Sequence, residues 1–192
     1  MRKLIIITVA ILATLSIAGC KCSKEEAVVD QQEIIVENTI STDREYMSLN
    51  YGDYSWYETC VVYDNYFDAD TTISVYGVSN VFQVVVAQEE SYDTKVVSIV
   101  HMADVSGIDA REHAFWVGDF KLNEENINLT FDQAFARLME TNIPKPHSKN
   151  VVLRREIGPK PNINAQYIFG NPNYQVYVDA VTGNVTDTNP AY

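Results

Sequence analysis

The sequence predicts an α+β fold, in which one main helix packs on a mostly antiparallel sheet. Runs rich in Val, Tyr and Thr alternate with polar residues and are separated by short turns, as in half-buried strands. A single segment, LTFDQAFARLMETN at 129–142, carries a strong helical repeat of apolar residues. Residues 44–192 remain after an apolar leader and a polar spacer, which is enough chain for one full core or for two small halves packed together.

Residues 1–19 have the features of a secretion signal. Met1-Arg2-Lys3 is basic, and 4–19 is uncharged and mostly apolar, which is shorter than the roughly 20 residues of a membrane-spanning helix. The ending Ile17-Ala18-Gly19-Cys20 resembles the lipobox of bacterial lipoproteins. The resemblance implies that residues 1–19 are removed and that Cys20 is acylated, with more than one chain for stable anchoring.

Residues 20–43 are polar and acidic, and we expect them to form a tether, with an apolar cluster at 34–36 as its last part. Lys24-Glu25-Glu26 resembles the short export signal of Bacteroidota-type lipoproteins, and the chain as a whole is similar to small lipoproteins of that type. The resemblance implies an outer-membrane lipoprotein, on the cell surface or on the periplasmic face. Both locations stay open, since any lipoprotein needs a charged spacer.

The charge of the chain excludes one class of partner. Removal of residues 1–19 takes away Arg2 and Lys3 and leaves 12 basic against 26 acidic side chains, a net charge of −14. Such a chain repels phosphate backbones, so we expect no nucleic-acid partner, and membrane attachment must come from the lipid. Cys22 and Cys60 either pair with each other, or Cys60 is a buried thiol in its strand.

The N-terminal half, 44–120, is predicted to be rich in strands. The segment WYETCVVY alternates in the manner of a strand, and DNYFDAD after it is typical of a surface turn. Two β-branched runs interrupted by Ser79-Asn80 follow, and 81–102 forms a hairpin candidate. The expected strands are 55–63, 71–78, 81–87, 95–102 and 113–117.

The C-terminal half, 121–192, is predicted to run helix, strand, strand, strand. Thr130 and Gln133 have the spacing of a capping box, and Pro144 and Pro146 stop the helix. The helix is expected to pack on the strands through one apolar face, made of Phe131, Phe135, Leu138 and Met139. The expected strands are 150–157, 166–169 and 174–178, with GNPN as the turn between the last two.

The C-terminal stretch YVDAVTG, with Tyr177, Val178, Asp179, Ala180, Thr182 and Gly183, resembles the ending of PepSY domains. The resemblance covers about 129–187 and implies a cystatin-like C-terminal half, association with proteins, and protease inhibition as one hypothesis. The residues explain the loop without a ligand: Asp179 can accept backbone hydrogen bonds of the turn, and Gly183 can adopt positive φ. A bound cation is the alternative, although calcium needs several oxygen ligands and only one carboxylate is local.

The remaining polar residues show no standard catalytic or metal motif. His101, His113 and His147 do not have zinc-ligand spacing, and Asp64, Asp68 and Asp70 lack the glycine and glutamate of an EF-hand loop. We therefore expect no metal, no cofactor and no catalytic residues. In this acidic chain a basic cluster that includes Arg154, Arg155 and Lys160 is notable. It either binds an acidic glycan or peptide, or it pairs with internal carboxylates.

These observations together predict a lipid-anchored, extracytoplasmic, non-catalytic binding module whose partner is a protein or a glycan. An accessory glycan- or peptide-binding lipoprotein is the alternative, and an unrecognised hydrolase is a third class. Clustered exposed aromatic rings would favour glycans, an exposed sheet edge would favour a protein, and a deep cleft with converging polar groups would favour an enzyme.

The lipobox generates a first prediction. Cys20→Ala should leave the chain uncleaved at this site and without acyl chains, because the cysteine supplies the thiol that is acylated. Intact-protein mass spectrometry of the membrane fraction measures both changes. An unsubstituted protein whose mature terminus lies elsewhere and carries no lipid would contradict the predicted localisation.

Overall fold

The computed structural model describes residues 33–69, 72–87, 92–113, 119–160 and 163–192. The predicted signal peptide, Cys20, Cys22 and most of the predicted tether lie outside the described residues. Within the described residues, no helix is long and apolar enough to cross a membrane.

A single eight-stranded antiparallel sheet runs through both halves of the chain, in the order β4-β3-β2-β1-β5-β6-β7-β8. The α+β class and the antiparallel sheet are therefore confirmed. The strands are β1 (Tyr54–Tyr63), β2 (Val75–Ala87), β3 (Tyr92–Met102), β4 (Val105–His113), β5 (Asn150–Arg154), β6 (Gln166–Asn171), β7 (Tyr174–Asp179) and β8 (Val185–Thr186).

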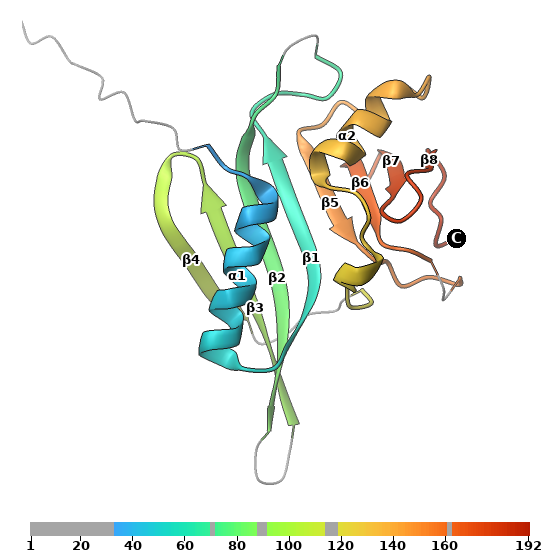
Figure 1. Cartoon of the computed structure of the whole chain (residues 1–192). Coiled ribbons are helices and arrows are strands. Elements are labelled where there is room, and N and C mark those ends of the chain that lie inside the picture. The colour runs from blue at the N-terminus through green and yellow to red at the C-terminus, as the bar shows by residue number, and fades with distance from the viewer. Residues whose placement is uncertain (1–32, 70–71, 88–91, 114–118, 161–162) are drawn as a thin grey trace, which may run out of the picture.

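Two helices, α1 (Val36–Tyr51) and α2 (Phe131–Glu140), lie on the same face of the sheet, and a 3₁₀ turn, η1 (Glu124–Asn126), precedes α2 (Figure 1). The prediction of one main helix was therefore wrong, and so was the tether assignment for 36–43. Val36, Ile40 and Met47 of α1 are buried at helical spacing. The tether prediction failed because polar and β-branched residues interrupt this apolar stripe.

Each half has the same order of elements: a helix is followed by a meander of strands. The two meanders meet through their first strands, since β1 pairs antiparallel with β5 and places Cys60 opposite Val152. The buried apolar residues of both halves form one cluster, which includes Met47 of α1 and Leu138 of α2. The two halves therefore share one core.

The boundaries of α2 follow from its sequence. The Thr130 hydroxyl accepts from the Gln133 amide, and the Gln133 side chain accepts from the Thr130 amide at 2.9 Å, which confirms the capping box. Phe131 and Leu138 are buried, and Phe135 is half-buried against other aromatic rings. Met139, predicted to face the core, is 46% exposed because it lies at the margin of the packed face.

The differences between the predicted and the observed strands have local causes. The hairpin of 81–102 is confirmed, but β2 continues through Ser79-Asn80, where the polar Asn80 side chain is fully buried. The prediction missed β4, because eight of its nine residues are exposed and show no alternation of apolar and polar side chains. The predicted strand at 113–117 lies mainly outside the described residues.

The packing of α2 generates a second prediction, which compares the buried Leu138 with its exposed neighbour Met139 and with the capping residue Thr130. Leu138→Ala should lower the free energy of unfolding by about 2–5 kcal/mol, because it leaves a cavity in the core. Met139→Ala should cost less than about 0.5 kcal/mol, and Thr130→Ala about 1 kcal/mol through loss of the cap. Urea denaturation measures these differences. Equal costs for the Leu138 and Met139 variants would mean that the face of α2 is assigned wrongly.

Candidate functional site

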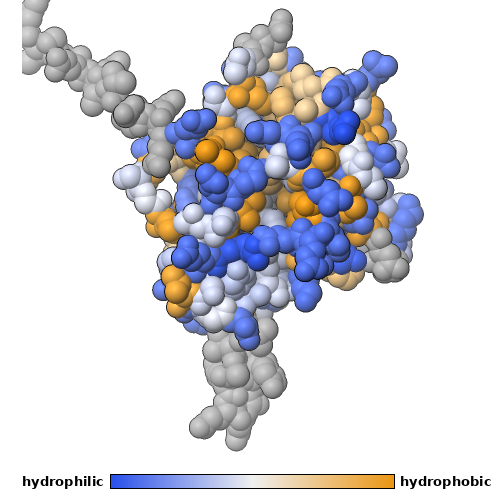
Figure 2. Space-filling model, viewed as in Figure 1, coloured by the Kyte–Doolittle hydropathy of each residue, from blue (hydrophilic) through white to orange (hydrophobic). Residues whose placement is uncertain are grey.

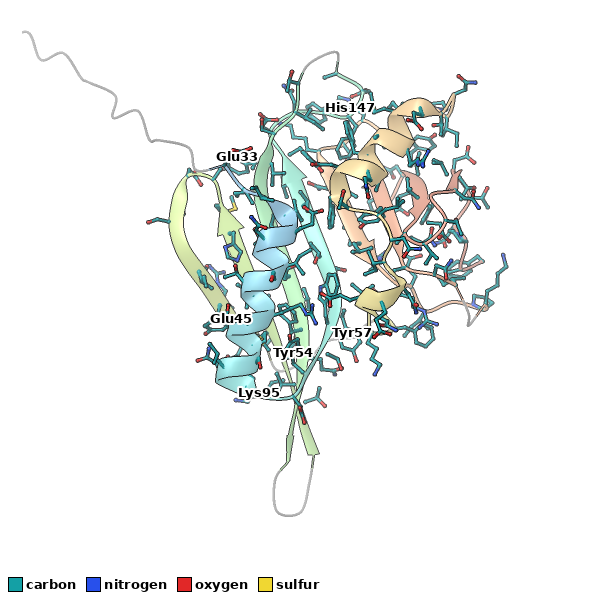
Figure 3. All side chains as sticks on the ribbon, in the orientation of Figure 1. Glu33, Glu45, Tyr54, Tyr57, Lys95 and His147 are labelled. Carbon is teal, nitrogen blue, oxygen red and sulfur yellow. The ribbon has the colours of Figure 1, made fainter. Side chains whose placement is uncertain are left out.

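A hollow of about 320 Å³ opens between the beginning of α1 and the hairpin formed by β3 and β4. Glu33, at its edge, lies where the described chain enters α1 (Figure 3). We call this hollow the α1–β4 pocket and define it by its principal lining residues, which are Ile35, Thr39, Thr42, His101, Val105 and Ile108.

The rim of the α1–β4 pocket is apolar and exposed. Ile35 is 50% exposed, Val105 61% and Ile108 44%. These are three of the few large apolar side chains that the described surface exposes, and they surround one hollow. Elsewhere on the helix-bearing face, apolar patches are interspersed with hydrophilic residues (Figure 2). Exposed apolar residues gathered around a hollow are typical of a binding surface.

A buried polar network supports the floor of the pocket. Asp43 belongs to α1 and is fully buried. Its carboxylate lies 2.7 Å from His101 Nε2 and accepts from the Asn80 side-chain amide at 2.7 Å. The Thr59 hydroxyl donates to the Asn80 carbonyl oxygen, and the Trp56 indole donates to Thr59 at 3.2 Å. The network thus joins α1 to β1, β2 and β3.

This network explains why Asp43 can be buried. A carboxylate without partners in a core costs several kcal/mol, but here each oxygen has a partner. His101, held through Nε2, keeps one orientation toward the pocket. Asp104, three residues after His101 in the sequence, instead accepts from the Tyr76 hydroxyl at 3.3 Å. The actual partner of His101 lies 58 positions earlier in the chain.

The other histidines occupy separate places. The Ser98 hydroxyl lies 2.7 Å from His113 Nε2 on the exposed edge of the sheet, and no described acceptor contacts the other ring nitrogen of His113. His147 contacts Asp68 at 3.0 Å and stacks on Tyr66 with 4.0 Å between ring centroids. Among the described residues, no group of three or more His, Cys, Asp or Glu side chains could hold a metal ion.

The predicted basic patch does not form one surface. Arg154 is half-buried beside three carboxylates: it contacts Glu156, and its guanidinium lies 3.9 Å from both Glu58 and Asp119. Burial raises the pKa of Glu58 and Asp119, while Arg154 opposes the shift.

The other two residues of this patch lie apart from that carboxylate cluster. Arg155 donates to the Ile163 carbonyl at 2.9 Å and lies over the Phe120 ring at 4.9 Å. Lys160 is exposed, and its backbone amide donates to the Ala191 carbonyl at 3.3 Å. Adjacent residues in β5 and the following loop therefore serve different contacts.

Asp179 and Gly183 lie in the turn between β7 and β8. One Asp179 oxygen accepts from the amides of Val181 and Thr182 at 2.9 and 2.8 Å, and Gly183 has φ +75°. Asn164 and Gln166 also donate to this carboxylate. Burial raises the pKa of Asp179, but these hydrogen bonds outweigh it, so the pKa lies below its ordinary value.

The same turn positions α2. The Ala180 carbonyl accepts from the amides of Asn128 and Leu129 at 2.9 and 3.2 Å, and the Asn128 side chain donates to the Val181 carbonyl at 3.1 Å. The chain therefore enters α2 along a path that the turn fixes. All of these contacts are accounted for without a ligand.

Cys60 has no disulfide partner among the described residues, and its half-buried thiol lies on the sheet face opposite the helices. Burial, with a contribution from Glu58, raises the pKa of the thiol to about 11, so it is protonated at neutral pH and a weak nucleophile.

Comparison of the chain with protein-family models, curated proteins and solved structures finds no match.

The Asp179 contacts generate a third prediction. Asp179→Ala should lower the free energy of unfolding by about 1–3 kcal/mol at pH 7, because it leaves the turn amides unpaired. Since the folded state lowers the pKa, this stabilisation is present above the ordinary carboxyl pKa near 4 and is lost as the pH falls through the lower, folded-state value. The cost of the substitution should therefore shrink in acid.

Denaturant melts between pH 7 and pH 3 measure this change. Asp187→Ala, an exposed carboxylate in the same C-terminal segment, is the matched control and should cost less than about 0.5 kcal/mol. A cost for Asp179→Ala that stays constant over this pH range would contradict the proposed role of the ionised carboxylate.

Proposed function

We propose that this protein is a lipid-anchored, extracytoplasmic, non-catalytic interaction module, and that the α1–β4 pocket takes an apolar side chain of a protein partner. The observation that carries the proposal is the exposed apolar rim of Ile35, Val105 and Ile108 around one hollow. Burial of these side chains by a partner would be favourable at about 25 cal/mol per Å² of apolar surface.

The chemistry of the partner segment follows from the pocket and from the charge of the chain. A hollow of about 320 Å³ is within the size range of small ligand pockets and is ample for one large apolar side chain. The mature chain carries a net charge of −14, so a segment with basic residues on either side of the apolar one would approach faster than an acidic one.

A glycan partner is less well supported. Glycan recognition through aromatic residues needs ring faces that are free to stack. Tyr66, an exposed tyrosine, is already in contact with the His147 ring and lies below the Lys149 ammonium at 5.0 Å. Tyr192 is the other large exposed aromatic residue among those described.

A hydrolase is the competing class, with Ser98 and His113 as its best candidate pair. A catalytic histidine needs an acceptor that orients its second ring nitrogen, and oxyanion donors beside the serine. Among the described residues, none contacts that nitrogen. The geometry thus gives a hydrolase weaker support than a binding module.

The location and the family remain part of this proposal. The lipobox at Cys20 supports an outer-membrane anchor, on the surface or on the periplasmic face. The YVDAVTG ending supports a PepSY-like, cystatin-like C-terminal half, and with it association with proteins and protease inhibition as one form of that association. The common helix-and-meander order of both halves is compatible with such a module.

A fourth prediction tests the pocket by photocrosslinking in the native envelope. A benzophenone amino acid at Val105 should give a discrete crosslinked protein, because this side chain lies at the pocket rim. The same probe at Met139, which is also exposed but lies on α2, should not give that product. Thr42→Trp, which fills the pocket from α1, should abolish the Val105 product without changing the melting temperature.

Mass spectrometry of the crosslinked product distinguishes the alternatives. A protein crosslinked at Val105 and lost with Thr42→Trp supports the proposal. Adducts with lipid or polysaccharide alone, or identical products from Val105 and Met139, would contradict it.

A further inference from the structure

At one end of the sheet, no strand among the described residues pairs with the outer edge of β4 (Figure 1). Eight of its nine residues are exposed, and α1 packs mainly on β1 and β2, while its Tyr51 hydroxyl reaches Glu112 on the helix-bearing face of β4. At the opposite end of the sheet, β8 has only two residues. An edge strand presents unpaired backbone donors and acceptors to any strand whose side chains are compatible with its own.

The charges on β4 restrict which strand is compatible. Asp109 and Arg111 lie two residues apart, so their side chains share the face of the sheet that carries no helix. The Arg111 guanidinium donates to the Asp109 carboxylate at 2.6 and 3.2 Å. On the helix-bearing side, Glu112 accepts from Lys95 and from the Tyr51 hydroxyl, each at 3.0 Å.

We propose that a second copy of this chain pairs with β4, antiparallel, about a two-fold axis at Ala110. In this register the Asp109 carboxylate of each copy lies opposite Arg111 of the other. The Asp109–Arg111 ion pair of one copy and that of the other then form an alternating cluster of four charges across the interface. The sheet becomes continuous through both copies, with all helices on one face.

The register follows from the symmetry and the charges. A two-fold axis perpendicular to the sheet must coincide with one residue, so that side chains of the same face stay opposite each other. An axis at residue 109 would oppose two Asp109 side chains, and one at 111 would oppose two Arg111 side chains. Axes at 107 or 108 leave both charges opposite uncharged residues. Only an axis at Ala110 opposes unlike charges, which stabilise cross-strand pairs.

This inference is independent of the proposed function. It concerns the paired segment 107–113 and its charges, whereas the α1–β4 pocket is tested at Val105 and Thr42. The charged residues, which protect an edge against arbitrary strands, here select one partner and one register. Loss of the dimer would leave the pocket product of Val105 unaffected, and an unused pocket would leave the dimer intact.

Disulfide crosslinking of the full chain in its membrane provides the test. Opposed residues of antiparallel strands have Cα atoms about 4.5–5.5 Å apart, within the range of a disulfide. Ala110→Cys should therefore give a covalent dimer under mild oxidation. Ser106→Cys is the control, because its two copies would lie about 26 Å apart along the paired strands. The parent chain, with its native cysteines, sets the background.

Charge reversal then tests the register. In the Ala110→Cys chain, Asp109→Arg or Arg111→Asp should reduce dimer yield about fivefold or more, because each opposes like charges. The two reversals together should restore the yield. Sedimentation of the purified parent in detergent should show a dimer, and the Arg111→Asp chain should show a monomer with an unchanged melting temperature.

Three results would overturn the proposal. The first is a dimer yield at Ala110→Cys no greater than that at Ser106→Cys. The second is a double reversal that stays at the level of the single ones while melting like the parent. The third is a parent chain that sediments as a monomer at the concentrations at which the Ala110→Cys chain forms the covalent dimer.

Discussion

The antiparallel pairing of β1 with β5 is the constraint on which the rest of the structure depends. It joins the first strands of two helix-and-meander halves, so that each half contributes four strands to one sheet. Because both helices lie on the same face, the seam brings Trp56 of β1 and Leu153 of β5 into one buried cluster. A break at this seam would divide the core rather than remove one strand from its edge.

Polar contacts across the seam fix the two helices relative to each other. The Glu37 carboxylate of α1 accepts from the Phe131 amide at 3.0 Å, so a residue of one helix caps the beginning of the other. The position of α1 in turn places Asp43 over Asn80 and His101. The geometry of the α1–β4 pocket therefore depends on contacts made at the centre of the sheet, as well as on its own lining.

The sequence predicted elements whose signals are local. The capping box and apolar repeat of α2 lie within a few residues, and the hairpin of β2 and β3 shows β-branched runs on both sides of a turn. By contrast, α1 contains a buried Asp43 and Thr39 in place of apolar residues, so its stripe is incomplete. The signal available in 36–47 was the helical spacing of Val36, Ile40 and Met47.

The candidate site was less predictable than the fold for a physical reason. Its polar residues come from α1, β1, β2 and β3, and nothing local links Asp43 with His101. The exposure of β4 also removes the alternation by which strands are recognised, although that exposure makes it available to a partner. For Arg154, a sequence shows the charge but not the three carboxylates that the fold brings around it.

The central seam also affects the folding kinetics. The hairpins of each half close short loops, whereas β1 and β5 pair residues such as Thr59 and Leu153, more than 90 positions apart. Closure of so long a loop costs entropy before any contact across it is made, so such pairings slow folding. Until β5 arrives, the inner edge of β1 is as open as an outer edge. Because the N-terminal half is synthesised first, that edge of β1 stays unpaired until the C-terminal half is available. Chaperones, or rapid folding of the C-terminal half, would limit incorrect strand pairing there.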